Sequence, residues 1–311
     1  MKKFFGYLVV ICLCGILYTN RKTMVNFFSL FFYGNETAIF GEPNEYYKNA
    51  SYKFVQDTDN LYPNNKQDVL NIVYSTLNRG VDNVTFYCGD NYTSCIDDVN
   101  AIADSSLYLS TINNLVHPFN SYKNIHFSIS NYGKVSIEVE KVYSEERIAL
   151  VNNKMDQIMS SIINDSMSDY DKILTFHDYI VNNTYYDGAV GDAGQIPEGN
   201  NSNTAYGVLY DGKAICSGYS DVMAIFLSRI GIDNYKISSD IHVWNLVNLN
   251  GVWKHIDATW DDPVTASGEN LLLHDFFMIN TYDLEQKEQE YEMHNHNYNQ
   301  DLYIEANIWE D

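Results

Sequence analysis

Residues 241–260 read IHVWNLVNLNGVWKHIDATW, a pattern that predicts a β-hairpin. Two runs of β-branched and aromatic residues flank Asn250-Gly251, the dipeptide most typical of a two-residue hairpin turn. Such a turn pairs Leu249 with Val252 and fixes the register of the residues beyond them. Because side chains alternate between the two faces of a strand, this register decides which side chains meet.

The predicted register brings a histidine close to an aspartate. Counting outward from the turn, Trp244 lies opposite Asp257, and His242 follows two residues further along the same face. His242 and Asp257 are then diagonal neighbours with Cβ atoms ~7–8 Å apart or less, which allows imidazole–carboxylate contact. Asp is disfavoured in strands unless it has a partner, so we interpret the pair as functional. His255 lies on the same face, nearer the turn, and is a rival base.

A second stretch places a cysteine at the start of a helix. Residues 203–220 read NTAYGVLYDGKAICSGYS, and apolar residues at helical spacing follow until Gly231, a natural helix stop. Cys216 therefore falls at or just before the first turn. The unpaired N–H groups and the positive end of the helix dipole there favour a thiolate and can hold an oxyanion. A buried cysteine acting as a small apolar residue is the alternative.

Cys216, His242 and Asp257 together have the chemistry of a thiol catalyst. His242 fits the base that takes the thiol proton and passes a proton to the leaving amine. Asp257 fits the carboxylate that fixes the tautomer and orientation of the imidazole. The acyl group would pass through a thioester on Cys216 to water or to an amine.

The combined pattern resembles bacterial transglutaminase-like (papain-type cysteine peptidase-like) domains over roughly residues 144–294. The matching stretches are 205–219, 242–245 and 255–263, with Phe176-His177-Asp178-Tyr179-Ile180 and His274-Asp275-Phe276-Phe277. The resemblance implies an α+β core in which the cysteine-bearing helix packs on an antiparallel sheet. It also implies activity on amide or isopeptide bonds of proteins or peptides. Cross-linking acyltransferases, proteases, other amidases and inactive domains share this fold, so the fold does not choose among them.

Three further residues receive roles in this interpretation. Tyr206 is the candidate oxyanion donor beside the N–H group of Cys216. Trp244 and Trp260 are candidates for a substrate groove, with core aromatics as the alternative for both.

We predict no metal and no cofactor. No calcium loop of the spaced-acid type is evident. The pair at His294 and His296 lies in a polar tail and is interpreted as solvated. His177, a lone histidine on a predicted helix, is given no role.

The N-terminus predicts a membrane anchor. It begins Met-Lys-Lys, followed by an apolar run over residues 4–18, which is typical of a signal-type segment over residues 1–22. Residues 17–19 make a poor cleavage site, so an uncleaved anchor is favoured over a secreted protein. We expect the remaining domains to lie outside the cytoplasm at the cell membrane. The net charge of −22 argues against a nucleic-acid partner.

Three regions follow the anchor. Residues 23–65 are polar and predict a stalk or linker. Residues 66–143 predict a small α/β domain with helices over 66–77 and 97–107, a strand over 84–87 and a hairpin over 125–139. Residues 144–311 predict the catalytic domain, with helices starting at Ser144 and Ser168 and a flexible loop over 187–203.

Two cysteines of the small domain are close in sequence. Outside the cytoplasm Cys88 and Cys95 can close a disulfide loop, and two free thiols are the alternative.

Two classes of function remain at this point. The first is a cell-surface cysteine protease or transglutaminase acting on a protein or peptide substrate. The second is a catalytically inactive cell-surface binding module, suggested by the predicted anchor and stalk. The intact cysteine, histidine and aspartate favour the enzyme.

Overall fold

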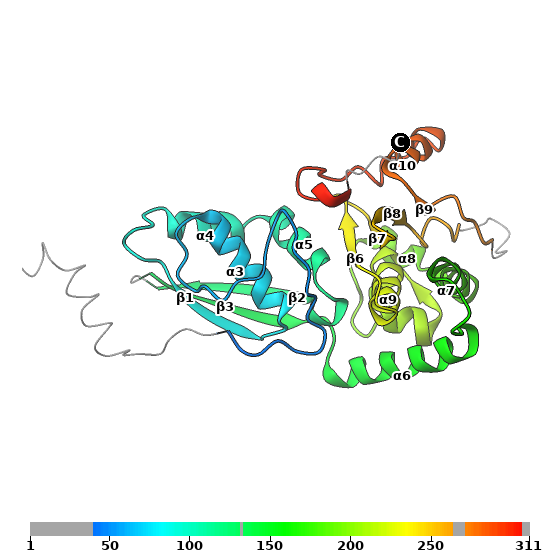
Figure 1. The fold of residues 1–311 in the computed structure, drawn as a ribbon, viewed down its shortest axis with the longest axis horizontal. Helices are drawn as coiled ribbons and strands as arrows, with labels where there is room; N and C mark the ends of the chain where they lie inside the picture. Colours follow the sequence, from blue (N-terminus) through cyan, green and yellow to red (C-terminus); the bar gives the residue numbers. More distant parts are fainter. Residues whose placement is uncertain (1–39, 131–132, 264–270, 307–311) are drawn as a thin grey trace, which may run out of the picture.

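The structure, a computed structural model, describes residues 40–130, 133–263 and 271–306. The predicted anchor, together with Cys12 and Cys14, lies outside these residues and stays a prediction. Within the described ranges, no helix has the length and apolar character needed to cross a membrane. The described chain is a mixed α+β structure with two groups of elements (Figure 1).

The first group is a three-stranded antiparallel sheet of order β1-β3-β2 with helices packed on it. Val84 and Phe86 of its first strand are buried in one apolar cluster with Ile72 of the first helix. Its elements are α3 (Lys66–Asn78), β1 (Asn83–Tyr87), α4 (Cys95–Ala103), α5 (Ser106–Leu115), η1 (Pro118–Asn120), β2 (Tyr122–Ile129) and β3 (Lys134–Lys141). The predicted first helix, strand and hairpin strands are confirmed, and part of the hairpin turn lies outside the described residues.

Two helices replace the single helix predicted over residues 97–107. The chain breaks between α4 and α5 because Ser105 takes an extended backbone conformation and caps α5, its side chain accepting a hydrogen bond from the N–H of Tyr108. A disulfide joins Cys88, just after β1, to Cys95 at the start of α4.

The part of the predicted stalk that the structure describes, residues 40–65, is packed onto the first group instead. Tyr52, Val55 and Leu61 are buried in its apolar cluster. Asp57 binds the guanidinium of Arg79 through two hydrogen bonds of 2.6 and 3.1 Å. The prediction was wrong here because these apolar residues belong to extended chain, which leaves no helical or strand period to detect.

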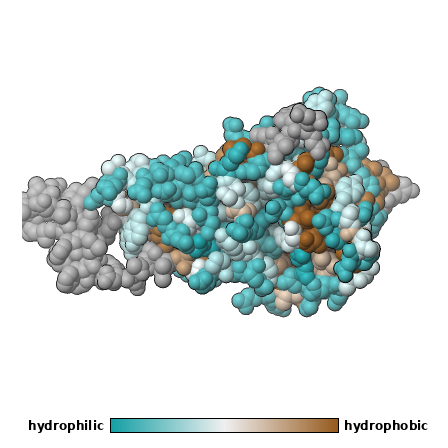
Figure 2. Space-filling model, in the orientation of Figure 1, coloured by the Kyte–Doolittle hydropathy of each residue, from teal (hydrophilic) through white to brown (hydrophobic). Residues whose placement is uncertain are grey.

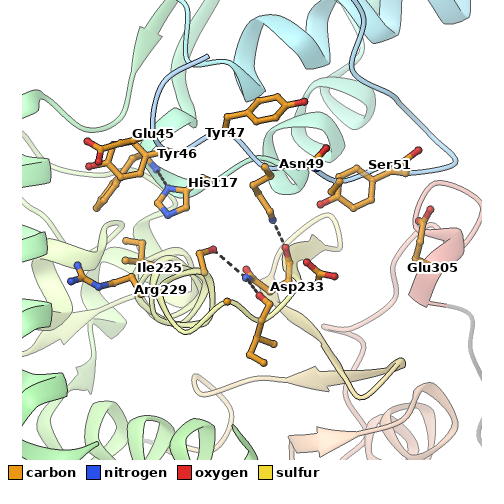
Figure 3. A pocket seen from close by; sticks show the side chains of 18 of the residues that line it. Glu45, Tyr46, Tyr47, Asn49, Ser51, His117, Ile225, Arg229, Asp233 and Glu305 are labelled. Carbon is orange, nitrogen blue, oxygen red and sulfur yellow. Dashed lines mark hydrogen bonds between the residues drawn. The ribbon is translucent and has the colours of Figure 1, made fainter. Parts of the chain in front are cut away.

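The same segment lines a cavity of about 550 Å³ between the two groups (Figure 3). Lys48 crosses toward the second group and donates a hydrogen bond to the backbone carbonyl of Asn234. Burial lowers the pKa of Lys48 to about 7. His117 lies beside the same segment, with its ring stacked on that of Tyr46 at 5.0 Å, and burial lowers its pKa to about 3.

The second group is built around a four-stranded antiparallel sheet of order β6-β7-β8-β9. Its long helices lie on one side of this sheet in Figure 1. Its elements are α6 (Glu145–Ile162), α7 (Asp169–Asn183), β4 (Tyr185–Tyr186), α8 (Gly188–Ala193), η2 (Gly207–Asp211), β5 (Lys213–Ala214), α9 (Cys216–Arg229), β6 (Asn234–Ser238), β7 (Val243–Leu249), β8 (Val252–Ile256), β9 (Phe277–Ile279), α10 (Thr281–Glu290) and η3 (Ile304–Ala306).

Serine caps start two of these helices as predicted. The side chain of Ser144 accepts a hydrogen bond from the N–H of Arg147, and that of Ser168 accepts one from the N–H of Asp171. The segment over 187–203, predicted to be a flexible loop, instead contains α8 and is tied down by a buried carboxylate. Asp187 accepts a hydrogen bond of 2.6 Å from the hydroxyl of Ser202.

Both faces of the four-stranded sheet are covered. Val247 and Ile256 pack with α7 and α9, where the rings of Phe176 and Phe226 stack with centroids 4.0 Å apart. The opposite face, which includes Trp244, packs against the first group and the C-terminal segment. The apolar cluster of the first group therefore extends into the second group, past residue 143, where the sequence predicts the boundary between the two domains.

The hairpin has the predicted register. Leu249 pairs with Val252, and the ladder continues to Asn245 opposite Ile256. Asn250 and Gly251 both have positive φ, 56° and 87°, as a type I′ turn requires. The hydrophilic character of much of the surface in Figure 2 agrees with the strong negative charge of the chain.

Candidate active site

Cys216 is the first residue of α9, as its sequence position predicts. Ile215 precedes it in an extended conformation and supplies no capping side chain. The carbonyl of Ile215 accepts hydrogen bonds from the N–H groups of Gly218 and Tyr219. The N–H groups of Cys216 and Ser217 are therefore the ones at the helix start that can face whatever approaches the thiol. Cys216 is partly exposed and is the one free cysteine in the described part of the chain.

A close approach of the chain explains the glycine two residues after this cysteine. A Cβ atom on Gly218 would lie 2.6 Å from the backbone oxygen of Ser202 and 2.9 Å from the Cβ of Ala214. The carbonyl of Ser202 also accepts a hydrogen bond of 2.8 Å from the N–H of Ile215. The segment before the helix is therefore pressed against its first turn, which fixes the position of the thiol.

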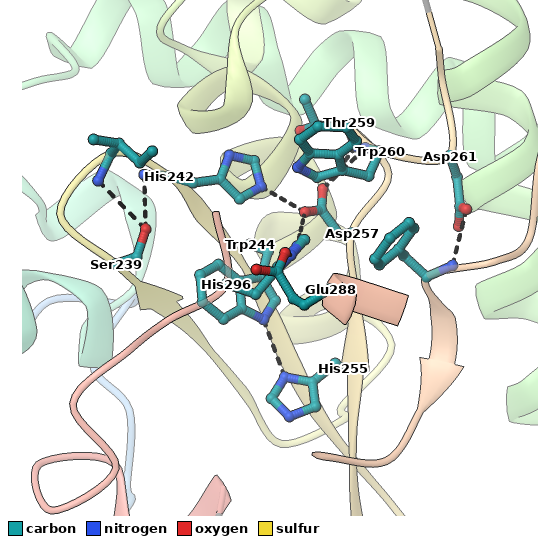
Figure 4. Close-up of polar contacts among 12 residues, drawn as sticks. Ser239, His242, Trp244, His255, Asp257, Thr259, Trp260, Asp261, Glu288 and His296 are labelled. Atoms are coloured by element: carbon teal, nitrogen blue, oxygen red, sulfur yellow. Dashed lines mark hydrogen bonds and ion pairs between the residues drawn. The ribbon is translucent and has the colours of Figure 1, made fainter. Parts of the chain in front are cut away.

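His242 and Asp257 meet at the end of the hairpin, as the register predicts. Nε2 of His242 lies 2.5 Å from Oδ2 of Asp257 (Figure 4). The thiol of Cys216 lies close enough to the imidazole of His242 to help raise the pKa of that ring. Because Nε2 faces the carboxylate, Nδ1 is the ring nitrogen left for the thiol. The structure thus brings the three predicted catalytic side chains together in the order thiol, imidazole, carboxylate.

Electrostatics favour a charged imidazole beside the thiol. Burial by itself lowers the pKa of His242, but the carboxylate of Asp257 outweighs burial and raises that pKa to about 10. Burial by itself raises the pKa of Asp257, but the neighbouring imidazoles hold it far below its usual range. At neutral pH the pair is therefore an imidazolium and a carboxylate, and the positive charge faces Cys216.

A second histidine, absent from the predicted site, binds the same carboxylate. Nε2 of His296 lies 2.8 Å from Oδ2 of Asp257, and its Nδ1 lies 2.6 Å from Oε1 of Glu288. The backbone N–H of Thr259 donates to the other oxygen of Asp257 at 2.9 Å. His296 is 4% exposed, so the interpretation of this histidine as solvated was wrong, whereas His294 is exposed as predicted. Nothing in its local sequence signals the contact, because the contact depends on how the C-terminal segment docks.

The comparisons with known proteins agree with this geometry. Residues 156–258, which carry all three side chains, match the family model of the Transglutaminase-like superfamily. The chain carries a transglutaminase-like domain. No curated protein matches it.

Two solved structures are similar to part of the chain. One is described as a TGase: it is 18% identical, the match covers 45% of this chain and 44% of that one, and the TM-score is 0.34. The other is a candidate cysteine protease from Cytophaga hutchinsonii: it is 15% identical, the match covers 44% of this chain and 61% of that one, and the TM-score is 0.28. The match therefore spans less than two thirds of either protein.

The tyrosine suggested by the sequence packs away from the thiol, and a different tyrosine interacts electrostatically with Cys216. The ring of Tyr206 stacks on Tyr210 at 4.6 Å and lies 3.8 Å from the guanidinium carbon of Arg147, on the side of α6. Tyr186 in β4 is half-buried, and burial raises its pKa, as does the nearby charge of Cys216. Both tyrosines precede the cysteine, and sequence spacing does not tell which one reaches it.

The two tryptophans differ in their surroundings. Trp244 is 1% exposed and donates a hydrogen bond of 3.0 Å to Nδ1 of His255, so it belongs to the core and cannot line a groove. Burial lowers the pKa of His255 to about 3, which removes it as a rival base at neutral pH. Trp260 is partly exposed, with its ring edge-on to His242 at 6.3 Å. It remains a candidate for contact with substrate.

Proposed function

We propose that the transglutaminase-like domain catalyses acyl transfer or hydrolysis at amide or isopeptide bonds of a protein or peptide, through a thioester on Cys216. The observation that carries this proposal is the position of His242, which binds the Asp257 carboxylate and lies close enough to the Cys216 thiol for the two groups to interact electrostatically. A cysteine packed as a small apolar residue needs neither contact.

The reaction follows from these contacts. The Cys216 thiolate attacks the carbonyl carbon of the amide, and the oxyanion that forms is held by N–H groups at the start of α9. The imidazolium of His242 gives its proton to the leaving amine as the C–N bond breaks, which leaves an acyl thioester. Water or a second amine then attacks the thioester, and His242 takes the proton of that nucleophile. The thiolate leaves, and the imidazolium is restored.

The fate of the thioester depends on how well the site excludes water from it. Cys216 is partly exposed, whereas His242 and Asp257 are buried. The acyl donor would thus approach Cys216 from the open side, next to Trp260. We also propose that the domain acts outside the cytoplasm, in agreement with the disulfide between Cys88 and Cys95.

An acyl-enzyme trap tests the proposal. The protein is incubated with a library of glutamine-containing and other peptides and quenched in acid, and the peptide that contains Cys216 is analysed by mass spectrometry. We expect an acyl adduct that is absent from Cys216→Ala. Adding a primary amine separates the two reactions, because an amide product indicates transfer and a free acid indicates hydrolysis. Two results together would contradict catalysis and favour a binding module. The wild-type protein would form no adduct with any peptide, and the Cys216→Ala variant would still capture a protein partner.

A further inference from the structure

Two sequence motifs that the proposed chemistry does not use meet in space. His177 and Asp178 lie on α7, and His274 lies just before β9, almost a hundred residues later. Nδ1 of His177 is 3.1 Å from Oδ1 of Asp178, and Nε2 of His274 is 2.7 Å from the same oxygen. The three ligand atoms all lie within 4.8 Å of one another.

We propose that His177, Asp178 and His274 bind a divalent transition-metal ion of the Zn²⁺ class. Two imidazole nitrogens and one carboxylate oxygen are a common ligand set for Zn²⁺, with water in the fourth position. Adjacent ligand atoms around a tetrahedral ion lie roughly 3.3 Å apart when the bonds are about 2.0 Å. The observed separations of 3.1 and 2.7 Å from the carboxylate oxygen need to open only by a few tenths of an ångström.

The surroundings of the buried ligand are those of a metal-bound histidine. A ligating imidazole usually directs its other nitrogen to a carboxylate, which fixes the ring and its tautomer. Nε2 of His177 lies 3.2 Å from Oδ2 of Asp261, and both side chains are fully buried. Neither of these two atoms has a hydrogen bond of good geometry in the described structure. The other oxygen of Asp261 accepts a hydrogen bond of 3.0 Å from the N–H of Phe276.

Charge and access also suit a cation. With both imidazoles neutral, Asp178 and Asp261 leave a charge of −2, which a divalent ion balances. The side chains of His274 and Asp178 are 45% and 32% exposed, so an ion can enter from solvent. The ion would tie α7 to the segment before β9 and, through His177 and Asp261, to the turn that follows Asp257. This binding does not depend on the proposed catalysis.

The test measures Zn²⁺ binding by isothermal titration calorimetry on the full chain with its disulfide intact. All variants carry Cys216→Ala, because a thiolate beside an imidazole can itself bind Zn²⁺. We expect one ion to bind per chain, and the His274→Ala variant to bind it at least tenfold more weakly. His126 is an exposed histidine on β2 and serves as the matched control, so His126→Ala should leave the affinity unchanged. Asp261→Asn keeps every ligand and should weaken binding roughly 10–100-fold.

A second readout removes any ambiguity from the calorimetry. Co²⁺ in the same background should give the visible absorption of a tetrahedral nitrogen and oxygen site, and His274→Ala should lose it while His126→Ala keeps it. Circular dichroism checks that each variant is folded. The proposal is overturned if the Cys216→Ala chain binds no ion, if His274→Ala binds as His126→Ala does, or if the ion is lost in His296→Leu and kept in His274→Ala.

Discussion

His296 lies 2.8 Å from the carboxylate of Asp257, so the carboxylate that orients the predicted catalytic base is itself held by a histidine from the C-terminal segment. Since Glu288 lies 2.6 Å from the other ring nitrogen, His296 is clamped between two carboxylates. We infer that His296 is a positioning residue. It acts through Asp257 and not on the substrate.

Replacing His296 should impair the thiol without unfolding the domain. His296→Leu removes a donor to Asp257, which frees the carboxylate to rotate away from His242. A misplacement of about 1 Å in such a site can cost roughly 10²-fold in rate. The measurement is the alkylation rate of Cys216 by iodoacetamide across pH 5 to 9. His294→Leu, two residues away in the same tail, is the control and should behave as wild type, whereas His296→Gln, which keeps an N–H donor, should recover part of the rate. Superimposable pH profiles for His296→Leu and His294→Leu would refute the role.

Gly218→Ala should move the start of α9. The added methyl group would meet the backbone oxygen of Ser202 at 2.6 Å, and backbone cannot rotate away as a side chain can. Overpacking of this kind costs about 1–3 kcal/mol of unfolding free energy, and the shift displaces Cys216. We expect a lower urea midpoint and a slower alkylation of the thiol. Gly188→Ala, where the added Cβ meets nothing within 4 Å, is the matched control. Equal alkylation rates in the two variants would show that the close approach does not position Cys216.

Variants of Tyr186 and Tyr206 decide which of these two tyrosines donates a hydrogen bond to the oxyanion. If the hydroxyl of Tyr186 helps to hold the oxyanion, Tyr186→Phe should lower kcat by about 10²-fold, the usual effect of losing one such donor. Tyr206→Phe should leave kcat unchanged, because that ring packs against Arg147 and Tyr210. Steady-state kinetics on a substrate identified by the acyl-enzyme trap decides between them. A loss of kcat in Tyr206→Phe alone would support Tyr206 as the oxyanion donor, as the sequence predicts.

The stability of the chain should fall at alkaline pH through His242. Its pKa is raised from 6.5 to about 10, so its contribution to folding is complete below pH 6.5 and is lost as the pH rises through 10. Urea unfolding of wild type and His242→Gln should therefore give a difference in unfolding free energy that is largest near pH 6 and shrinks toward pH 10. A difference that grows with pH over this range would mean that His242 is not protonated in the folded chain.

The sequence predicts the features of this fold that are set locally. The dipeptide Asn250-Gly251 fixes a hairpin register, and that register alone brings His242 and Asp257 together. Helical spacing after Cys216 is enough to place the thiol at a helix start. These inferences need only the geometry of one turn and one helix.

Features set by tertiary docking could not be predicted in this way. His296 reaches Asp257 only because the C-terminal segment folds back over the hairpin. Trp244 is buried because the C-terminal segment, with His296 and Tyr298, packs against its ring, which its own strand pattern does not show. The sequence predicts a stalk at Tyr52 and Val55 because extended chain that packs on a helix shows no periodic spacing of apolar residues.

The alkylation of Cys216 at pH 6 tests the central claim most directly. At this pH an ordinary thiol is almost wholly protonated and reacts slowly with iodoacetamide. The reaction is followed on the peptide that contains Cys216, with glutathione as the reference thiol. The account predicts that Cys216 reacts at least tenfold faster than glutathione and that His242→Gln brings it down to the reference rate. A wild-type rate no faster than that of glutathione, or a fast rate unaffected by His242→Gln, would contradict it.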